Sequence, residues 1–257
     1  MTSEATTSYP PYRYVKFGLI VTGETEERHL PKLFKTLMEL GICYFEVIRR
    51  VPQLGPITSQ KRKLKITGVK HKKIPSKDEK EITWPARGYL NEENHYVIVV
   101  DDLEHSNKEQ APAVFERYRN ALDILPPTHK NRASVHFLVY MLEAYYFADA
   151  PAINSVLGTS LKDYSGDVET IRHPKGDLKQ RYRGFDEKEN GGEILEKLDV
   201  EKVLSNPDTC ASLRTLFAWC LKCLGQTPTD RYQLVNGKLS EITRSQLDNI
   251  KSPKSPG

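Results

Sequence analysis

Four apolar segments in the first half of the chain have the composition of buried β-strands. The clearest is HYVIVVDD at residues 95–102, in which β-branched and aromatic residues run directly into two acids. The other strands are expected at residues 15–21, 42–48 and 133–140. Apolar residues occupy successive positions in these segments with few interruptions, a pattern typical of parallel strands that helices cover on both faces. The sequence therefore predicts an α/β fold with a small, mainly parallel sheet flanked by helices.

Helical segments alternate with these strands. They are expected at residues 30–40, 84–90, 107–125 and 143–153, where apolar residues recur at helical spacing. From Pro151 onward the pattern changes to short helices separated by polar loops. We therefore expect a C-terminal helical region that packs against the sheet.

The expected organisation of the chain has four parts. Residues 1–12 and 250–257 are polar and rich in Pro or Ser, so both ends are expected to be disordered. Residues 13–150 form the α/β domain, which carries a basic insertion at about residues 50–82. Residues 151–249 form the helical C-terminal region.

Composition favours a cytoplasmic protein with no membrane association. None of the apolar runs in the 257 residues approaches the roughly 20 residues that a membrane span needs. The N-terminus has neither the basic start nor the apolar stretch of a signal peptide. Four cysteines are too few for a disulfide framework in a chain of this length, so we expect reduced thiols.

Acidic residues follow three of the predicted strands. Glu24, Glu26 and Glu27 come after the first, Asp101, Asp102 and Glu104 after the third, and Glu143 after the fourth. The carboxyl ends of parallel strands share one edge of the sheet, and binding sites form at that edge. If these strands are neighbours, the acidic side chains meet there.

Clustered carboxylates repel one another unless a cation or a proton neutralises them. Mg²⁺ and Mn²⁺ are hard cations that take oxygen ligands, and a metal at this place can clamp a phosphodiester and activate water. The alternative is that acids after strands cap helices or occupy first turns, where the helix dipole favours them. This alternative is favoured for Glu24 and Glu27 taken singly, whereas a functional role is favoured for the acids of residues 101–104.

The net charge of +4 is unevenly distributed. Residues 49–80 contain eleven Lys or Arg and only two acids. This segment is either a mobile, solvated insertion or a surface that binds phosphates, and both explanations remain open. In the second case the candidate nucleic-acid contacts are Lys61, Arg62, Lys63, Lys65, Lys70, Lys72 and Lys73.

The order of these motifs resembles that of TOPRIM domains, the metal-dependent phosphodiester-handling domains of topoisomerases, primases and overcoming-lysogenization-defect (OLD) nucleases. Four stretches carry the similarity: IVTGETEERHLPKLF, VIVVDDLEH, VYMLEAYYFAD, and ETIRHPKGDLK followed by CASLRTLFAWCL. The first two are generic to TOPRIM domains. The last two are more similar to stand-alone bacterial TOPRIM-like proteins of unknown function, which are often paired with an ABC-type ATPase in phage defence.

The resemblance implies a TOPRIM-like sheet and roles for particular acids. Glu26 matches a metal-binding glutamate of the first motif in OLD-type nucleases. Asp101, Asp102 and Glu104 cover the acidic motif, and either Asp101 leads it or Asp102 and Glu104 form the working pair. Glu143 matches an acidic residue of the third motif.

Lys175 and Thr22 are also compared, the first with the stand-alone TOPRIM-like proteins and the second with TOPRIM domains in general. Lys175 stands where the group has a Pro-Lys pair, and a lysine there can stabilise negative charge on a phosphate under attack. TOPRIM first motifs read Val-Glu-Gly, whereas this chain has Val21-Thr22-Gly23. Threonine cannot carry charge, which leaves three explanations open: Glu24 substitutes for the missing acid, the site binds metal weakly, or cleavage has been lost.

Two functional hypotheses follow. The first is a Mg²⁺- or Mn²⁺-dependent nuclease that cuts DNA or RNA as an effector in an anti-phage defence system. Its catalytic residues would be Glu26, Glu143 and Lys175, and its metal ligands Glu26, Asp101, Asp102 and Glu104. The chain has no P-loop motif, so the ATPase would be a separate ABC-type partner. The second hypothesis is a catalytically degenerate binding or regulatory subunit of such a complex. A homo-oligomer is compatible with both.

Overall fold

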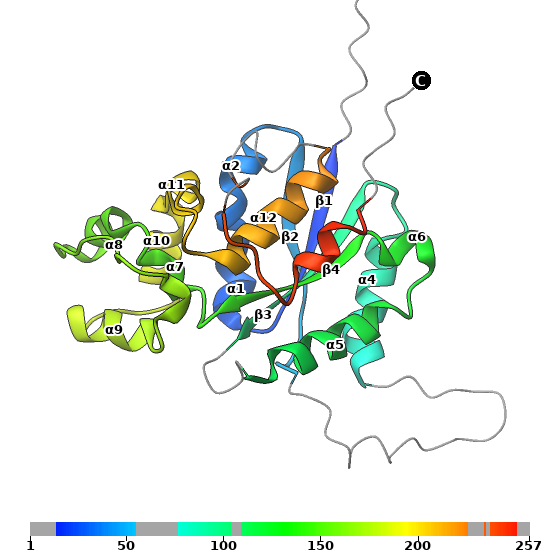
Figure 1. Cartoon of the computed structure of the whole chain (residues 1–257), viewed down its shortest axis with the longest axis horizontal. Coiled ribbons are helices and arrows are strands. Elements are labelled where there is room, and N and C mark those ends of the chain that lie inside the picture. Colours follow the sequence, from blue (N-terminus) through cyan, green and yellow to red (C-terminus); the bar gives the residue numbers. More distant parts are fainter. Residues whose placement is uncertain (1–13, 55–76, 104–108, 226–233, 235–236, 251–257) are drawn as a thin grey trace, which may run out of the picture.

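The computed structural model describes residues 14–54, 77–103, 109–225, 234 and 237–250 (Figure 1). The expected disordered N-terminus lies outside these residues, as does the expected tail beyond Ile250. Glu104 and the seven candidate nucleic-acid contacts of the basic insertion also lie outside the described residues.

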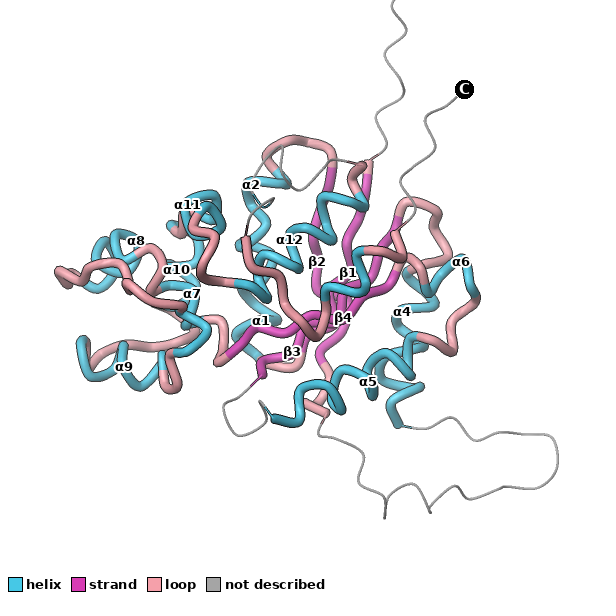
Figure 2. The backbone as a smooth tube through the Cα atoms, in the orientation of Figure 1, coloured by secondary structure: helices cyan, strands magenta, loops and turns pink. Residues whose placement is uncertain are grey.

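A four-stranded parallel sheet forms the centre of the molecule (Figures 1 and 2). Its strands are β1 (Val15–Val21), β2 (Cys43–Arg50), β3 (His95–Leu103) and β4 (Ala133–Val139). Their order is β2-β1-β3-β4, and every neighbouring pair is parallel. The predicted α/β class with a small parallel sheet is therefore confirmed.

Helices cover both faces of the sheet (Figure 2). One face packs against α1 (Glu24–His29), the 3₁₀ turn Leu30–Phe34, α2 (Lys35–Met38) and α12 (Ala211–Cys223). The other face packs against α4 (Trp84–Tyr89), which a π-helical turn at Glu79–Thr83 precedes, and against α5 (Ala111–Leu122). Helix α6 (Pro127–Lys130) precedes β4.

Aromatic side chains build the core between the sheet and the first group of helices. The ring of Phe45 stacks between Phe17 and Phe34, at centroid distances of 4.4 and 4.0 Å. Trp219 of α12 meets Phe17 and Tyr96 edge-on. Such pairs contribute about 0.5–1.5 kcal/mol each beyond the apolar area that they bury. The C-terminal helix α12 is thus part of the sheet's own covering layer.

Five short helices gather beyond the carboxyl ends of the strands and form a lobe (Figure 1). They are α7 (Glu143–Tyr146), α8 (Ala150–Leu157), α9 (Pro174–Arg181), α10 (Asn190–Lys197) and α11 (Val200–Ser205). A 3₁₀ turn at Val168–Thr170 belongs to this lobe, and another at Arg244–Leu247 packs against α12. Helix α10 contacts α1 and α9 contacts α7, so the lobe faces the same edge of the sheet as the acidic motifs.

Two expected helices differ from the structure. The helix expected at residues 30–40 begins earlier, at Glu24, and is broken by the 3₁₀ turn Leu30–Phe34. Pro31 lies at the start of that turn, because it has no N–H to donate to a continuous helix. The helix expected at residues 143–153 is two helices, and Pro151 occupies the first turn of the second.

The four cysteines are free and buried. Cys220 and Cys223, which stand three residues apart in α12, are part of the apolar core. Among the described residues, no helix combines the length and the apolar character that crossing a bilayer requires.

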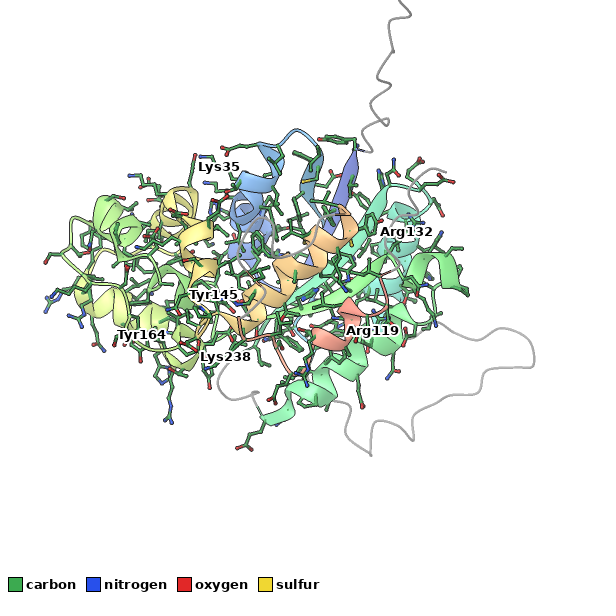
Figure 3. All side chains as sticks on the ribbon, turned by 45° about the horizontal axis from the view of Figure 1, so that its top comes forward. Lys35, Arg119, Arg132, Tyr145, Tyr164 and Lys238 are labelled. Carbon is green, nitrogen blue, oxygen red and sulfur yellow. The ribbon has the colours of Figure 1, made fainter. Side chains whose placement is uncertain are left out.

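Glu169 links the lobe to the sheet through buried hydrogen bonds. Its raised pKa is expected to make the stability of the fold depend on pH. Its Oε1 accepts hydrogen bonds from the hydroxyl of Tyr145, at 2.9 Å, and from the backbone N–H of Ser212, at 2.8 Å. Tyr145 lies where the lobe meets the sheet, and its hydroxyl also accepts a hydrogen bond from the N–H of Val139 (Figure 3). Burial raises the pKa of Glu169 to about 7, and the two donors oppose that rise.

We expect Glu169→Gln to remove part of the pH dependence of stability. A carboxyl whose pKa is raised on folding stabilises the protein below its unfolded pKa, and that stability is lost as the pH rises through about 7. The difference in free energy of unfolding between wild type and variant should change by about 3 kcal/mol between pH 4.5 and pH 8. Urea unfolding at both pH values measures it, with the exposed Glu193→Gln as the control. An unchanged difference would contradict the assignment.

Candidate metal centre

The carboxyl ends of β1, β3 and β4 lie side by side. Pairing of β1 with β3 aligns Val21 with Val100, and pairing of β3 with β4 aligns Asp102 with Leu138. Helix α1 begins three residues after the end of β1, and α7 begins four residues after the end of β4. The turns that carry the acids therefore meet at one edge of the sheet, where the helical lobe also packs (Figure 1).

Glu26 is the acid of α1 that points into the molecule. It is only 3% exposed, although it lies in the first turn of the helix. Gly23 makes this position accessible, because a Cβ atom at Gly23 would overlap the carboxylate of Glu26. The turn between β1 and α1 thus provides a recess for one carboxylate.

Glu24 and Glu27 point outward from the same helix. The carboxylate of Glu24 accepts a hydrogen bond from Arg28 at 2.7 Å and lies 2.9 Å from the ammonium of Lys188. Glu27 forms an ion pair with Arg50 at 3.2 Å. Both are first-turn acids in surface ion pairs, so neither joins Glu26 in the interior.

Asp101 and Asp102 project from opposite faces of β3, because successive side chains of a strand alternate. Asp101 lies on the α5 face, where its Oδ1 accepts from the hydroxyl of Thr22 at 2.8 Å and its Oδ2 from the hydroxyl of Tyr118 at 2.9 Å. Burial raises the pKa of Asp101 to about 6, and these two donors oppose the rise. Both of its oxygens have partners, so Asp101 ties β3 to β1 and α5.

Asp102 faces the other acids. Burial raises its pKa well above the ordinary value, and the neighbouring charges of Glu26 and Glu143 raise it further. A hydrogen bond that the protonated carboxyl of Asp102 donates to Glu26 raises the pKa of Asp102 as well. The residue as a whole is partly exposed, but its Oδ1 is shielded from solvent and no hydrogen-bond donor reaches that atom within the described residues. Asp102, rather than Asp101, is therefore the acid of β3 that meets the glutamates.

Glu143 reaches the cluster from a strained turn. Tyr140 and Met141, between β4 and α7, have φ values of +57° and +82°, which side chains other than Gly, Asn and Asp rarely adopt. Such backbone costs about 1–3 kcal/mol per residue and is concentrated at functional sites. The turn delivers Glu143, which is 3% exposed, as the first residue of α7. Burial raises the pKa of Glu143, and the charge of Glu26 adds to the rise.

Lys175 lies near this cluster. It stands in the first turn of α9 and forms an ion pair with Glu187. Its positive charge, with that of Lys179, acts to lower the pKa of Glu143. The lobe thus places positive charge beside Glu143.

Comparison with protein families gives one match, over residues 21–219, to the family described as Domain of unknown function (DUF4276). The chain belongs to the DUF4276 family. The matched region begins at the end of β1 and ends within α12, so it includes every acid of the cluster. No curated protein matches the chain, and no solved structure matches it.

The residues that DUF4276 covers here have the donor chemistry of a Mg²⁺ or Mn²⁺ site. Glu26, Asp102 and Glu143 offer only oxygen atoms, which hard divalent cations prefer. The Oδ1 atom of Asp102 is shielded from solvent and has no hydrogen-bond partner among the described residues, so it could serve as a ligand atom. Among those residues no three His, Cys, Asp or Glu side chains are already arranged around a common ion position. A cation would therefore have to draw the three carboxylates together.

The buried Tyr146 packs beside this cluster, as expected of an aromatic residue one helical turn after Glu143. Tyr146 is fully buried, and its hydroxyl donates to the carbonyl of Gly191 at 3.2 Å. Burial raises its pKa well above the ordinary value, and the charges of Glu143, Glu26 and Asp102 raise it further. The signal was present in the sequence, because residues 143 and 146 are three apart and share one face of a helix.

Proposed function

We propose that this chain is a Mg²⁺- or Mn²⁺-dependent nuclease that cleaves phosphodiester bonds of DNA or RNA. The observation that carries the proposal is the shielded Oδ1 of Asp102, which no donor in the described residues reaches, beside the buried Glu26 and Glu143. Three carboxylates in so little solvent repel one another, and a divalent cation relieves the repulsion.

Particular residues of the chain would have separate roles in the reaction. Glu26, Asp102 and Glu143 would hold the cation, and Gly23 would keep the recess for Glu26 open. A bound Mg²⁺ or Mn²⁺ would polarise a phosphate oxygen and lower the pKa of a water molecule. Lys175 would stabilise the negative charge that builds on the phosphate.

We also propose the narrower relationship to TOPRIM domains, and in particular to the stand-alone group that is paired with ABC-type ATPases. A parallel four-stranded sheet with acids at its carboxyl edge supports it, because the resemblance implies that arrangement. On this proposal the protein acts in the cytoplasm as the effector of an anti-phage system, under the control of a separate ATPase.

One observation favours the second candidate, a binding or regulatory subunit without cleavage. Thr22 stands where the first TOPRIM motif has its glutamate, and its hydroxyl is committed to Asp101. No described acid replaces the missing one, since Glu24 is held in ion pairs with Arg28 and Lys188. This subunit would keep the fold and the cation but not the reaction.

A pair of neighbouring glutamates tests the proposal. In the presence of Mn²⁺ we expect the purified protein to cleave plasmid DNA or tRNA, and Glu26→Gln to slow cleavage about 10-fold to 100-fold. Glu27→Gln is the matched control, because Glu27 lies on the same helix in a surface ion pair, and it should change the rate less than twofold. If no divalent cation supports cleavage, the second candidate is favoured.

A further inference from the structure

Helix α9 and the turn after it form the most basic short segment in the described part of the second half of the chain. Residues 172–183 contain Arg172, Lys175, Lys179, Arg181 and Arg183, against the single acid Asp177. All of these cations except Lys175 are exposed. Lys175 pairs with Glu187, but among the described residues no ion pair is found for the other four. The segment therefore presents positive charge to solvent, although Asp186 lies close enough to Lys179 to feel its charge.

This basic segment includes the helix that packs beside the acidic cluster. Helix α9 packs against α7, whose first residue is Glu143. Lys175 and Lys179 are both close enough to lower the pKa of Glu143. Arg181 and Arg183 lie farther along the chain, at the end of α9 and beyond it. A polyanion that had one phosphate at the cluster would meet the next cations along this segment.

An exposed aromatic side chain stands among these cations. Tyr182 ends α9 in an extended conformation and is 41% exposed. Its ring lies over Gly184, where a Cβ atom would approach it to 3.1 Å. Its carbonyl accepts a hydrogen bond from Phe185, which is buried, so the turn is anchored to the lobe. Tyr182 is thus a supported ring with part of its surface open.

We propose that α9 and its Arg181-Tyr182-Arg183 turn bind the single strand of nucleic acid on which the acidic cluster acts, an inference that rests on the proposed nuclease function. Phosphates contact Lys179, Arg181 and Arg183, and an unpaired base stacks on Tyr182. Aromatic rings combined with backbone-tracking cations are typical of proteins that bind single strands without reading sequence. A nucleic-acid duplex and an acidic protein fit this surface less well. The bases of a duplex are already stacked on one another, and an acidic protein has no bases, so neither partner would stack on Tyr182.

Binding in the absence of metal tests this inference separately from cleavage. We would measure fluorescence anisotropy of a labelled 20-nucleotide single strand with the full chain in EDTA. Tyr182→Ala should weaken binding about tenfold, and Tyr182→Phe, which keeps the ring, should restore it. Arg183→Ala should weaken binding and reduce the salt dependence by about one phosphate contact. The controls are Tyr44→Ala and Arg87→Ala, both exposed on other parts of the protein.

The outcomes separate the two proposals. If Tyr182→Ala and Arg183→Ala bind the strand as tightly as wild type does, the inference is wrong, whether or not the protein cleaves. Tighter binding of a duplex or of an acidic peptide than of the single strand would also overturn it. If the variants weaken binding as expected but no metal supports cleavage, the proposed nuclease function fails and the binding surface stands.

Discussion

Asp102→Asn should greatly slow cleavage and at the same time stabilise the metal-free protein. The expected loss of activity is about 100-fold to 1,000-fold, the range seen when one group that stabilises charge in the transition state is removed. The expected gain is a rise in Tm of about 2–4 °C, which corresponds to about 1 kcal/mol in a domain of this size. The opposite signs of the two effects distinguish a metal ligand from a residue that supports the fold.

The physical reason is that Asp102 lies among like charges. Burial and the carboxylates of Glu26 and Glu143 all raise its pKa, so the ionised side chain is unfavourable in the absence of a cation. Asparagine keeps the shape and removes the charge, which relieves the repulsion and also removes a ligand. Residues held in unfavourable environments for function commonly show this exchange between stability and activity.

Thermal unfolding with and without 5–10 mM Mn²⁺, on the order of the concentrations that saturate weak carboxylate sites, measures the stability half of this prediction. Wild type should gain Tm when Mn²⁺ is added, whereas Asp102→Asn should not. Asp101→Asn is the informative comparison, because Asp101 accepts hydrogen bonds from Thr22 and Tyr118. It should lower Tm and leave the response to Mn²⁺ in place. A lower Tm for metal-free Asp102→Asn would contradict the account.

Arg214→Ala should have the largest effect on stability. Arg214 of α12 is 0% exposed, and its guanidinium donates to the carbonyls of Leu204, Asn206 and Thr209, the last at 3.1 Å. Alanine would leave three carbonyls without a donor and a cavity beside them. We expect a loss of about 3–5 kcal/mol in the free energy of unfolding, which urea denaturation measures.

Arg214→Ala should destabilise the helical lobe more than the sheet. Thr209 accepts a hydrogen bond from the N–H of Val168 and donates one to Asp167, so the loop that Arg214 holds also anchors the turn that carries Glu169. Arg214→Lys should lose less, because one ammonium can still reach some of the carbonyls. The exposed Arg244→Ala is the control and should change stability by less than about 0.5 kcal/mol. A similar small loss for Arg214→Ala would show that the contacts contribute little.

The α/β class was predictable because β1, β3 and β4 are almost continuously buried and largely apolar. Residues 95–102 contain no alternation between apolar and polar positions, and β3 lies in the middle of the sheet with helices on either side. The broken helix after β1 was harder to predict, since Leu33, Phe34 and Leu37 have helical spacing and only Pro31 indicates the 3₁₀ turn. The local effect of a proline competes there with a periodic pattern that extends past it.

The candidate site was predictable only in part. The position of Glu26, Asp102 and Glu143 after neighbouring parallel strands follows from strand topology. The sequence left open which of Asp101 and Asp102 leads the motif, because the choice depends on which helix covers which face of β3. In the structure Tyr118 of α5 donates to Asp101 on the far face, which leaves Asp102 as the acid of β3 on the side of Glu26 and Glu143. Nothing local in the sequence indicates the positive φ values that precede α7.

The surface ion pairs show a similar limit. Glu24 and Glu27 are two of three closely spaced acids in one turn, and their spacing alone does not separate them from Glu26. The structure separates them through partners distant in the chain, Lys188 for Glu24 and Arg50 for Glu27. The sequence spacing indicated the turn, and the tertiary contacts show that Glu26 is its buried acid.

The most direct test of the account is the position of a bound metal. We would soak crystals of the protein in Mn²⁺ and compute an anomalous difference map. The account predicts one strong peak within roughly 2.0–2.5 Å of carboxylate oxygens from Glu26, Asp102 and Glu143, the distance range of oxygen ligands on such cations. A map with no peak among these three side chains at saturating Mn²⁺, or with the ion held by surface carboxylates such as Glu24, would contradict it.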